Sequence, residues 1–214
     1  MIEGAKDDSM TRPDDDFMAE MHGLETAYVE SADPIVQSGF SGGRQRWSTE
    51  RSPLTDAIDR DGDFLDVGCA NGLLASDVCR WAAARGHHLI PHGIDLGPWL
   101  VALAKERHTD NAGNFEAADA WSWHPDRHWS FVYSTTHLAP LELICEWLQR
   151  LWAWVAPGGR LILGSYGSHS RRMTPDNVES VLVRCGFEVA GSSSGGEGPI
   201  ARYAWVDKRD GFAD

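Results

Sequence analysis

The sequence predicts an α/β protein, in which helices cover both faces of a mostly parallel sheet. Strand-like apolar segments alternate with helical segments from residue 63 onward, which is typical of parallel strands joined by crossover helices. The last two strand-like segments have no helix between them, which indicates an antiparallel pair at one edge. The length of 214 residues favours one such domain over two.

The elements begin after an acidic N-terminal segment, residues 1–16, which offers almost nothing to bury and is expected to be a disordered tail. Residues 17–60 are expected to form a helical cap, with a Gly-rich loop at 38–44 and a second helix at 53–59. Apolar side chains recur along one face of its first helix, namely Phe17, Met21, Leu24 and Tyr28. We expect this stripe to close over the site as a lid or to pair with its copy in a homodimer.

The remaining elements are expected to form a domain over residues 61–208, followed by a short tail at 209–214. Apolar runs between turn residues place the strands at 63–68, 89–94, 114–117, 129–134, 160–165, 187–190 and 201–206. One-sided apolar patterns place the helices at 71–85, 98–107, 140–155 and 174–185. Thr174 is expected to cap the last helix, with Pro175 at its first position and Gly186 after its end.

The charge of the chain argues against nucleic acid as its main partner. Acidic residues outnumber basic ones 32 to 19, for a net charge of −13, whereas nucleic-acid-binding proteins usually carry a basic face. No apolar run approaches the roughly 20 residues of a membrane span, and residues 1–16 lack the apolar core of a secretory signal. The cysteines are widely spaced, and we expect all four to be buried free thiols of a cytoplasmic protein: Cys69, Cys79, Cys145 and Cys185.

Three acidic residues follow three successive strands. Asp66 ends the first strand, and the small residues at 68–72 then turn the chain into a helix N-terminus with free N–H groups. Asp95 ends the second strand, where a carboxylate is placed to accept two hydrogen bonds from a ribose diol. Asp119 follows the third strand. The carboxyl ends of neighbouring parallel strands form the ligand crevice of an open α/β sheet, so a nucleotide-like ligand is expected there.

These segments resemble the class I S-adenosylmethionine-dependent methyltransferases over roughly residues 60–206. The first family motif is an acid followed by alternating glycines, and Asp66, Gly68 and Gly72 match it, with Ala70 in place of the middle glycine. Asp95 matches the ribose-binding acid of the family, and residues 119–120 match its adenine-edge segment. Residues 155–161 resemble the turn before its fifth strand. A nicotinamide-binding fingerprint needs glycines at offsets of zero, two and five, whereas here they stand at zero and four.

The resemblance implies a doubly wound, Rossmann-like sheet of seven strands with an antiparallel edge hairpin, and S-adenosylmethionine as cofactor with S-adenosylhomocysteine as product. Cofactor-binding residues are then expected to be Asp66, Gly68, Ala70, Gly72, Asp95, Leu96, Asp119, Ala120, Trp121, Ser134 and Trp47. Trp121 is expected to pack on the adenine ring or to belong to the hydrophobic core. The hydroxyl of Ser134 suits the methionine end, and Trp47 stands among arginines that suit the carboxylate of the cofactor.

The predicted activity is methyl transfer to a small-molecule acceptor, a metabolite or natural product, at oxygen, nitrogen or carbon. His137 follows the fourth strand and is the candidate general base, the alternative being a loop residue without a chemical task. No acidic residue stands at the tip of that strand, so no metal is expected. An RNA methyltransferase and a non-catalytic S-adenosylmethionine-binding module are the alternative functions. We expect a monomer or homodimer that does not enter a membrane.

Overall fold

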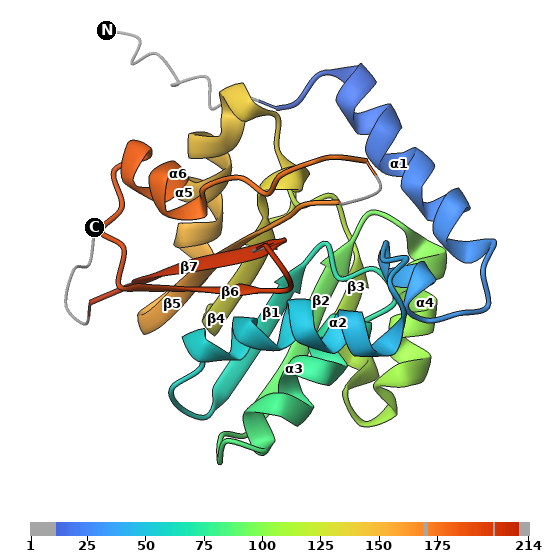
Figure 1. Ribbon diagram of the computed structural model, residues 1–214, viewed down its shortest axis with the longest axis horizontal. Helices are drawn as coiled ribbons and strands as arrows, with labels where there is room; N and C mark the ends of the chain where they lie inside the picture. Colours follow the sequence, from blue (N-terminus) through green and yellow to red (C-terminus); the bar gives the residue numbers. More distant parts are fainter. Residues whose placement is uncertain (1–11, 169–170, 199, 210–214) are drawn as a thin grey trace, which may run out of the picture.

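The fold is built on a seven-stranded sheet (Figure 1). The computed structural model describes residues 12–168, 171–198 and 200–209. The strands are β1 (Gly62–Val67), β2 (Leu89–Asp95), β3 (Phe115–Ala117), β4 (Trp129–Thr135), β5 (Val155–Tyr166), β6 (Gly191–Gly195) and β7 (Ala201–Asp207). The α-helices are α1 (Asp15–Val29), α2 (Gly43–Arg51), α3 (Leu73–Ala83), α4 (Pro98–Arg107), α5 (Ile144–Trp154) and α6 (Val178–Arg184). Short 3₁₀ turns are η1 (Val36–Ser38), η2 (Ser52–Ala57), η3 (Thr109–Asn114), η4 (Thr136–Leu138) and η5 (Leu141–Leu143).

The strand order is β3-β2-β1-β4-β5-β7-β6. The first five strands of this order pair in parallel, and β7 runs antiparallel to both β5 and β6. This arrangement confirms the predicted parallel sheet with an antiparallel hairpin at one edge. Because β1 and β4 are neighbours, the chain winds outward from them in both directions, and a ligand crevice is expected beyond their carboxyl ends.

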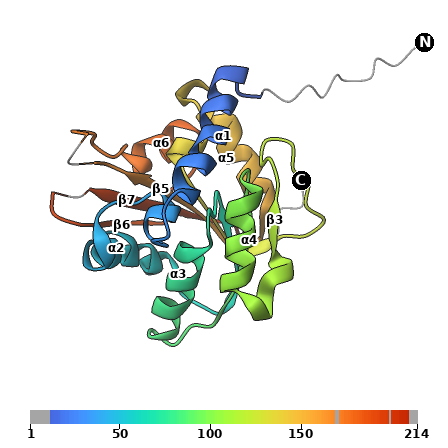
Figure 2. The same ribbon diagram turned by 90° about the vertical axis from the view of Figure 1, so that its right-hand side faces the viewer.

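Helices cover both faces of the sheet (Figure 2). On one face, η2, α3 and α4 bury apolar side chains against the strands, among them Leu54, Val78 and Val101. On the other face, α5 and α6 do the same through residues such as Leu148, Leu151 and Leu182. Helix α1 lies near the N-terminus of α4, and its Met18 packs into the hydrophobic cluster on the α5 and α6 side. Each layer therefore holds the strands in place while their carboxyl ends stay accessible.

The N-terminal part of the chain differs from the prediction around the Gly-rich loop. A helix, α2, forms at Gly43–Arg51, and the segment expected to be helical at 53–59 is mostly the 3₁₀ turn η2. The reason is tertiary, because the buried carboxylate of Asp77 on α3 accepts hydrogen bonds from Arg44 at 2.8 Å and from the Trp47 indole at 2.7 Å. These bonds fix α2 against α3, a pairing that the local composition does not indicate.

The C-terminal elements differ from the prediction in their boundaries. Helix α6 begins at Val178 with Asn177 as its N-cap, whose side chain accepts a hydrogen bond from Ser180 N at 3.0 Å, so Thr174 does not cap it. The sixth strand lies at Gly191–Gly195, between the two segments expected to be the last strands, and not at 187–190. Small residues are needed there, because a Cβ on Gly195 would lie 2.7 Å from the carbonyl oxygen of Thr49 on α2.

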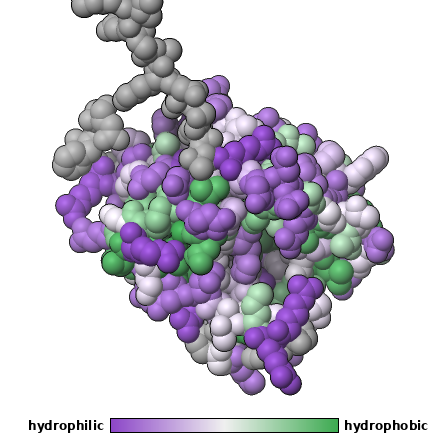
Figure 3. Space-filling model, turned by 90° about the horizontal axis from the view of Figure 1, so that it is seen from above, coloured by the Kyte–Doolittle hydropathy of each residue, from purple (hydrophilic) through white to green (hydrophobic). Residues whose placement is uncertain are grey.

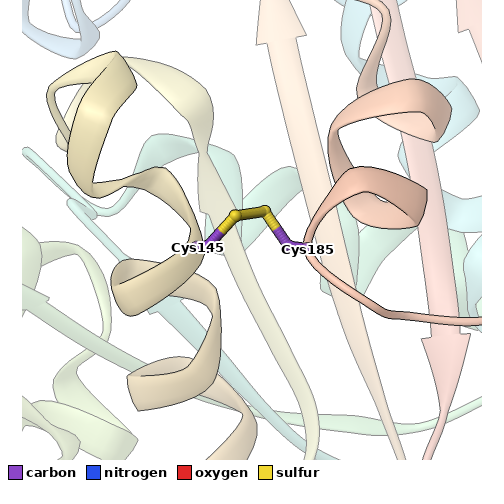
Figure 4. Close-up of a disulfide and its surroundings, with 2 residues drawn as sticks. All are labelled: Cys145 and Cys185. Carbon is purple, nitrogen blue, oxygen red and sulfur yellow. A yellow bond between two sulfur atoms is a disulfide. The ribbon is translucent and has the colours of Figure 1, made fainter.

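The prediction of four free thiols was wrong for two of the cysteines. Cys145 and Cys185, 40 residues apart, form a disulfide that joins α5 to the end of α6 (Figure 4). The two helices pack side by side on one face of the sheet, which brings these cysteines together. Cys69 and Cys79 are free, and burial raises the pKa of the Cys79 thiol to about 12.

The predicted tails, 1–16 and 209–214, lie mostly outside the described residues, but Asp15 and Asp16 belong to α1, so the N-terminal tail prediction was wrong for these two residues. Within the described part, Asp14 caps α1 by accepting a hydrogen bond from Phe17 N at 2.9 Å, and the helix begins at Asp15. Across the described ranges, no helix is long and apolar enough to cross a membrane.

Candidate active site

A cavity of about 810 Å³ lies at the carboxyl ends of the parallel strands, between the sheet and α1. This volume falls within the range of typical small-molecule sites, roughly 300–1,000 Å³. Figure 3 looks onto this side of the molecule, which is mostly hydrophilic with small hydrophobic areas around a hollow. The tips of β1, β2 and β4, the end of β5, and helices α1 and α2 all contribute to its wall.

The turn after β1 forms one wall of the cavity. Gly68 has a φ of +81°, and Gly68 N and Cys69 N both donate to the carbonyl of Ile94, at 2.8 and 3.0 Å. Ala70 has a φ of +45°, in the left-handed region that favours glycine. Ala70 N donates to Asp95 Oδ2 at 2.8 Å. The turn and the second strand tip are thus bonded into one surface.

Asp95 lies in the cavity wall as predicted. Its Oδ1 accepts a hydrogen bond from Gly97 N at 2.8 Å, in addition to the bond from Ala70. Burial raises the pKa of Asp95, and the two backbone hydrogen bonds act in the opposite direction. Each carboxylate oxygen has a second lone pair, so the oriented side chain can still accept hydrogen bonds from a ribose diol.

Asp66 is a buried acid that lacks a partner on one oxygen. It lines the cavity with 2% of its surface exposed, and among the described residues no donor reaches its Oδ2. Burial, and secondly the charge of Asp95, raise the pKa of Asp66 to about 8. A buried unpaired carboxylate calls for a donor or a cation. The ammonium group of S-adenosylmethionine is both, so Asp66 fits the expected cofactor.

The third acidic segment also lines the cavity, through Asp119, Ala120 and Trp121, together with Leu96. Asp119 accepts a hydrogen bond from Trp121 N at 2.9 Å and forms an ion pair with Arg12 at 3.0 Å. Trp121 is only 7% exposed, and its ring centroid lies 4.9 Å from that of Trp147. Trp121 therefore belongs to the core and also borders the cavity, and its packing on the adenine ring stays a prediction.

Two of the predicted residues do not line the cavity. Ser134 is fully buried, and its hydroxyl accepts a hydrogen bond from the Trp147 indole at 3.2 Å. Its neighbours Tyr133 and Thr135 line the cavity instead, because successive side chains of a strand point to opposite sides. Gly72 is the N-cap of α3 and lies behind the turn.

His137 lies in η4 and borders the cavity. Partial burial lowers its pKa, Asp176 acts in the opposite direction, and Arg51 adds to the lowering. The lowered pKa favours the neutral imidazole, the form in which it can accept a proton. Across the described part of the chain, no group of three or more His, Cys, Asp or Glu side chains is arranged to hold a metal ion.

Helix α1 supplies the wall opposite the strand tips. All four residues of its apolar stripe line the cavity, namely Phe17, Met21, Leu24 and Tyr28. Glu25 accepts a hydrogen bond from Trp99 N at 2.7 Å, which holds α1 at the N-terminus of α4. Burial, and secondly Asp95, raise the pKa of Tyr28.

The sequence did not single out a cluster of aromatic and basic side chains beside α2. The guanidinium of Arg51 lies over the Tyr166 ring, 3.5 Å from its centroid, and the hydroxyl groups of Tyr166 and Tyr133 are hydrogen-bonded. Trp47 lines the cavity with 2% of its surface exposed. The arginines near Trp47 were the available signal, but the sequence could not distinguish Arg51, which faces the cavity, from Arg44, which pairs with Asp77.

Comparisons with known proteins agree with this geometry. A family model described as a methyltransferase domain matches residues 41–190. Trans-aconitate 2-methyltransferase of Streptomyces avermitilis is 29% identical over 166 residues, covering 72% of this chain. The chain spans 59% of the length of that relative.

Solved methyltransferase structures show the same fold. N-methyltransferase NodS from Bradyrhizobium japonicum, in complex with S-adenosylhomocysteine, aligns with a TM-score of 0.61 at 15% identity, covering 88% of this chain and 97% of that one. Magnesium protoporphyrin IX methyltransferase from Synechocystis, with bound S-adenosylmethionine, gives 0.62 at 15% identity, covering 92% and 99%. These likenesses confirm the fold class.

Proposed function

Since the chain belongs to the class I S-adenosylmethionine-dependent methyltransferases, we propose that it transfers a methyl group from the cofactor to a small-molecule acceptor, at oxygen or nitrogen. The observation that carries this proposal is the cavity, which joins three acidic strand tips to an aromatic compartment under α1. The cofactor supplies an activated methyl group on a sulfonium, so the protein has mainly to bind and orient both partners.

The residues divide into a cofactor part and an acceptor part. Asp95 is assigned to the ribose hydroxyls, Asp66 to the ammonium group, and residues 119–121 to the adenine edge. Arg46, which also lines the cavity, suits the carboxylate of the cofactor. Gly68 and Ala70 give the cofactor close access to the backbone of the turn.

The acceptor compartment is formed by Tyr28, Tyr133, Tyr166, His137 and Met173. Methyl transfer to a neutral hydroxyl or amine breaks the carbon–sulfur bond, forms a carbon–oxygen or carbon–nitrogen bond, and releases one proton from the acceptor. His137 is assigned to take that proton because its lowered pKa keeps it neutral.

An acceptor of low molecular mass is supported by the distribution of arginines. Those lining the cavity are Arg46, Arg51 and Arg171. Near them, Arg44 and Arg80 are held in ion pairs with Asp77, so they do not extend a basic surface for RNA. Trans-aconitate, on which the Streptomyces relative is named to act, is a reasonable first acceptor to test.

The test is transfer of labelled methyl groups from S-adenosylmethionine in the presence of EDTA, with small-molecule extract, total RNA and trans-aconitate as separate acceptors. We expect label in the small-molecule fraction and undiminished transfer with EDTA. Label in RNA alone would support the nucleic-acid alternative. Binding of S-adenosylhomocysteine without transfer to any acceptor would support a binding module.

We further propose that α1 acts as a lid over the acceptor. Its stripe lines the cavity, and the Asn71 side chain donates to Pro34 O at 2.8 Å, tying the segment after α1 to the glycine turn. Deleting residues 1–30 should abolish acceptor turnover, while the affinity for S-adenosylhomocysteine and the oligomeric state in solution stay unchanged. A protein that lacks only residues 1–11 serves as the control. A change from dimer to monomer with persistent turnover per chain would instead identify the stripe as an interface.

Cytoplasmic location is part of this proposal, and the free thiols of Cys69 and Cys79 are compatible with it. The Cys145–Cys185 disulfide weighs against it, because reducing compartments keep most thiols reduced. Counting free thiols in protein isolated from its native cells under alkylating conditions distinguishes the two: two free thiols per chain indicate the disulfide, and four indicate its absence.

A further inference from the structure

Arg51 is a buried cation at the wall of the cavity. It ends α2, is 6% exposed, and lines the cavity. Aromatic rings surround its guanidinium, with Tyr166 at 3.5 Å from the ring centroid and Phe40 and Trp47 at 4.8 and 5.3 Å. Stacking on Tyr166 covers one face of this planar group and leaves its hydrogen-bonding edge as the part that can receive a ligand.

The hydrogen bonding of Arg51 is incomplete. A guanidinium carries five N–H donors. Within the described residues, its one hydrogen bond runs from Nη1 to Glu50 Oε2 at 3.4 Å, a long contact. The other oxygen of Glu50 already accepts a hydrogen bond from Arg46 at 2.5 Å. Two cations therefore share one carboxylate, and because Arg51 lines the cavity, a ligand there can reach its remaining N–H groups.

Charged side chains of both signs line the cavity. The acids Asp66, Asp95 and Asp119 are assigned to the cofactor, whereas Arg51 and Arg171 have no partner assigned in the cofactor. Arg171 is exposed at the rim, its guanidinium forms no ion pair in the part of the chain that is described, and its charge lowers the pKa of Tyr28. An uncharged acceptor would leave Arg51 with only its long contact to the shared Glu50 carboxylate, and Arg171 without an ion pair among the described residues.

We propose that the acceptor is a carboxylic acid whose carboxylate binds the edge of the Arg51 guanidinium, with Arg171 adding positive charge at the rim. This assignment rests on the proposed function, which supplies a second small molecule beside the cofactor. Arg51 serves recognition in it and takes no part in moving the methyl group. A carboxylate can accept two parallel N–H bonds from one guanidinium, which also fixes the orientation of the acceptor.

The cofactor carries a carboxylate of its own, so the experiment measures the two sources separately. Calorimetric titration with S-adenosylhomocysteine reports on the carboxylate of the cofactor. Titration of protein saturated with S-adenosylhomocysteine then uses succinate, citrate, trans-aconitate and benzoate, with succinamide and benzamide as uncharged counterparts. The variants are Arg51→Gln and Arg51→Lys, and Arg184→Gln on the exposed side of α6 is the matched control.

We expect the unmodified protein to bind at least one of the acids and neither amide. Arg51→Gln should weaken binding of that acid by about tenfold or more, because charge-assisted bonds are lost, and should leave S-adenosylhomocysteine affinity within about twofold. Arg51→Lys should recover part of the affinity, since it keeps the charge but not the planar fork. Arg184→Gln should match the unmodified protein.

Two outcomes overturn the assignment. The first is that none of the acids binds to the unmodified protein. The second is that Arg51→Gln and Arg51→Lys lower the affinity for S-adenosylhomocysteine without affecting acid binding, which would mean that Arg51 binds the carboxylate of the cofactor. Unfolding midpoints show whether Arg51→Gln is folded; if it is not, Arg51→Lys decides. Methyl transfer to uncharged acceptors alone would refute the carboxylate site and leave the proposed function standing. Binding of an acid at Arg51 without methyl transfer to any acceptor would refute the proposed function and leave the carboxylate site standing.

Discussion

Replacing Asp66 with asparagine should change how the stability of the ligand-free protein depends on pH. Burial and the charge of Asp95 raise the pKa of Asp66 from 3.8 to about 8. Between these values the folded protein keeps a proton that the unfolded chain has released. The folded state thus binds more protons than the unfolded state, so the free energy of unfolding falls as the pH rises from about 4 to about 8.

The size of the effect follows from the pKa shift. One pKa unit corresponds to about 1.4 kcal/mol, so at pH 7 the unfolded chain gains about 4 kcal/mol by ionising Asp66. Asparagine cannot ionise and removes this gain, but its buried amide has no partner in place of Oδ2, which costs about 1–3 kcal/mol. We expect Asp66→Asn to be more stable than the unmodified protein by about 1–3 kcal/mol at pH 7, and less stable by a similar amount at pH 4.

Urea unfolding between pH 4 and pH 8.5 measures the effect, with Asp110→Asn on the exposed surface as control. The two stability curves, for the unmodified protein and for Asp66→Asn, should cross within this range. Binding of S-adenosylhomocysteine, whose ammonium group is assigned to Asp66, should release about one proton near pH 7 from the unmodified protein and none from Asp66→Asn. Parallel stability curves, or equal proton release measured by calorimetry in two buffers, would refute the reasoning.

Three further predictions concern the cofactor, the disulfide and metal ions. Asp95→Ala should weaken S-adenosylhomocysteine binding by a few kcal/mol, because charge-assisted hydrogen bonds are worth roughly 1.5–3 kcal/mol each; unchanged affinity in calorimetry would remove Asp95 from the site. Reducing Cys145–Cys185 should lower the free energy of unfolding by about 4 kcal/mol, the chain-entropy value for a loop of 40 residues. Denaturation with and without reductant measures it, Cys79→Ser should respond like the unmodified protein, and Cys145→Ser should lose the response. Cofactor binding should survive EDTA, and loss of binding that magnesium restores would contradict the expectation of a metal-free site.

The sequence determined the features that depend on neighbours along the chain. Apolar runs bounded by turn residues marked the strands β1, β2 and β4 to within a residue or two. Once parallel pairing is expected, the acids at strand ends must lie at one edge of the sheet, and Asp66, Asp95 and Asp119 all line the cavity. The stripe on α1 was visible for the same reason, because helical periodicity acts over three or four residues.

The sequence was less informative where contacts between distant elements set the boundaries. The Ser/Gly-rich segment at Gly191–Gly195 has low strand preference, yet it pairs with β7 because its small residues fit against α2. Ser134 was assigned to the site, but side chains alternate between the two faces along β4, and those of Tyr133 and Thr135 line the cavity instead. A one-residue change of phase moves a side chain to the other side of a strand.

Only the tertiary structure decided which residues from separate elements meet. Cys145 and Cys185 join because α5 and α6 pack on the same face of the sheet, and nothing in their spacing indicates a pair. Arg51 reaches Tyr166 across more than a hundred residues of sequence, while Arg44, on the same helix, is drawn to Asp77. Strand and helix signals are encoded within a few residues and can be interpreted one segment at a time. A pairing between distant side chains exists only after the layers have packed, so its energy belongs to the assembled fold and to no single segment.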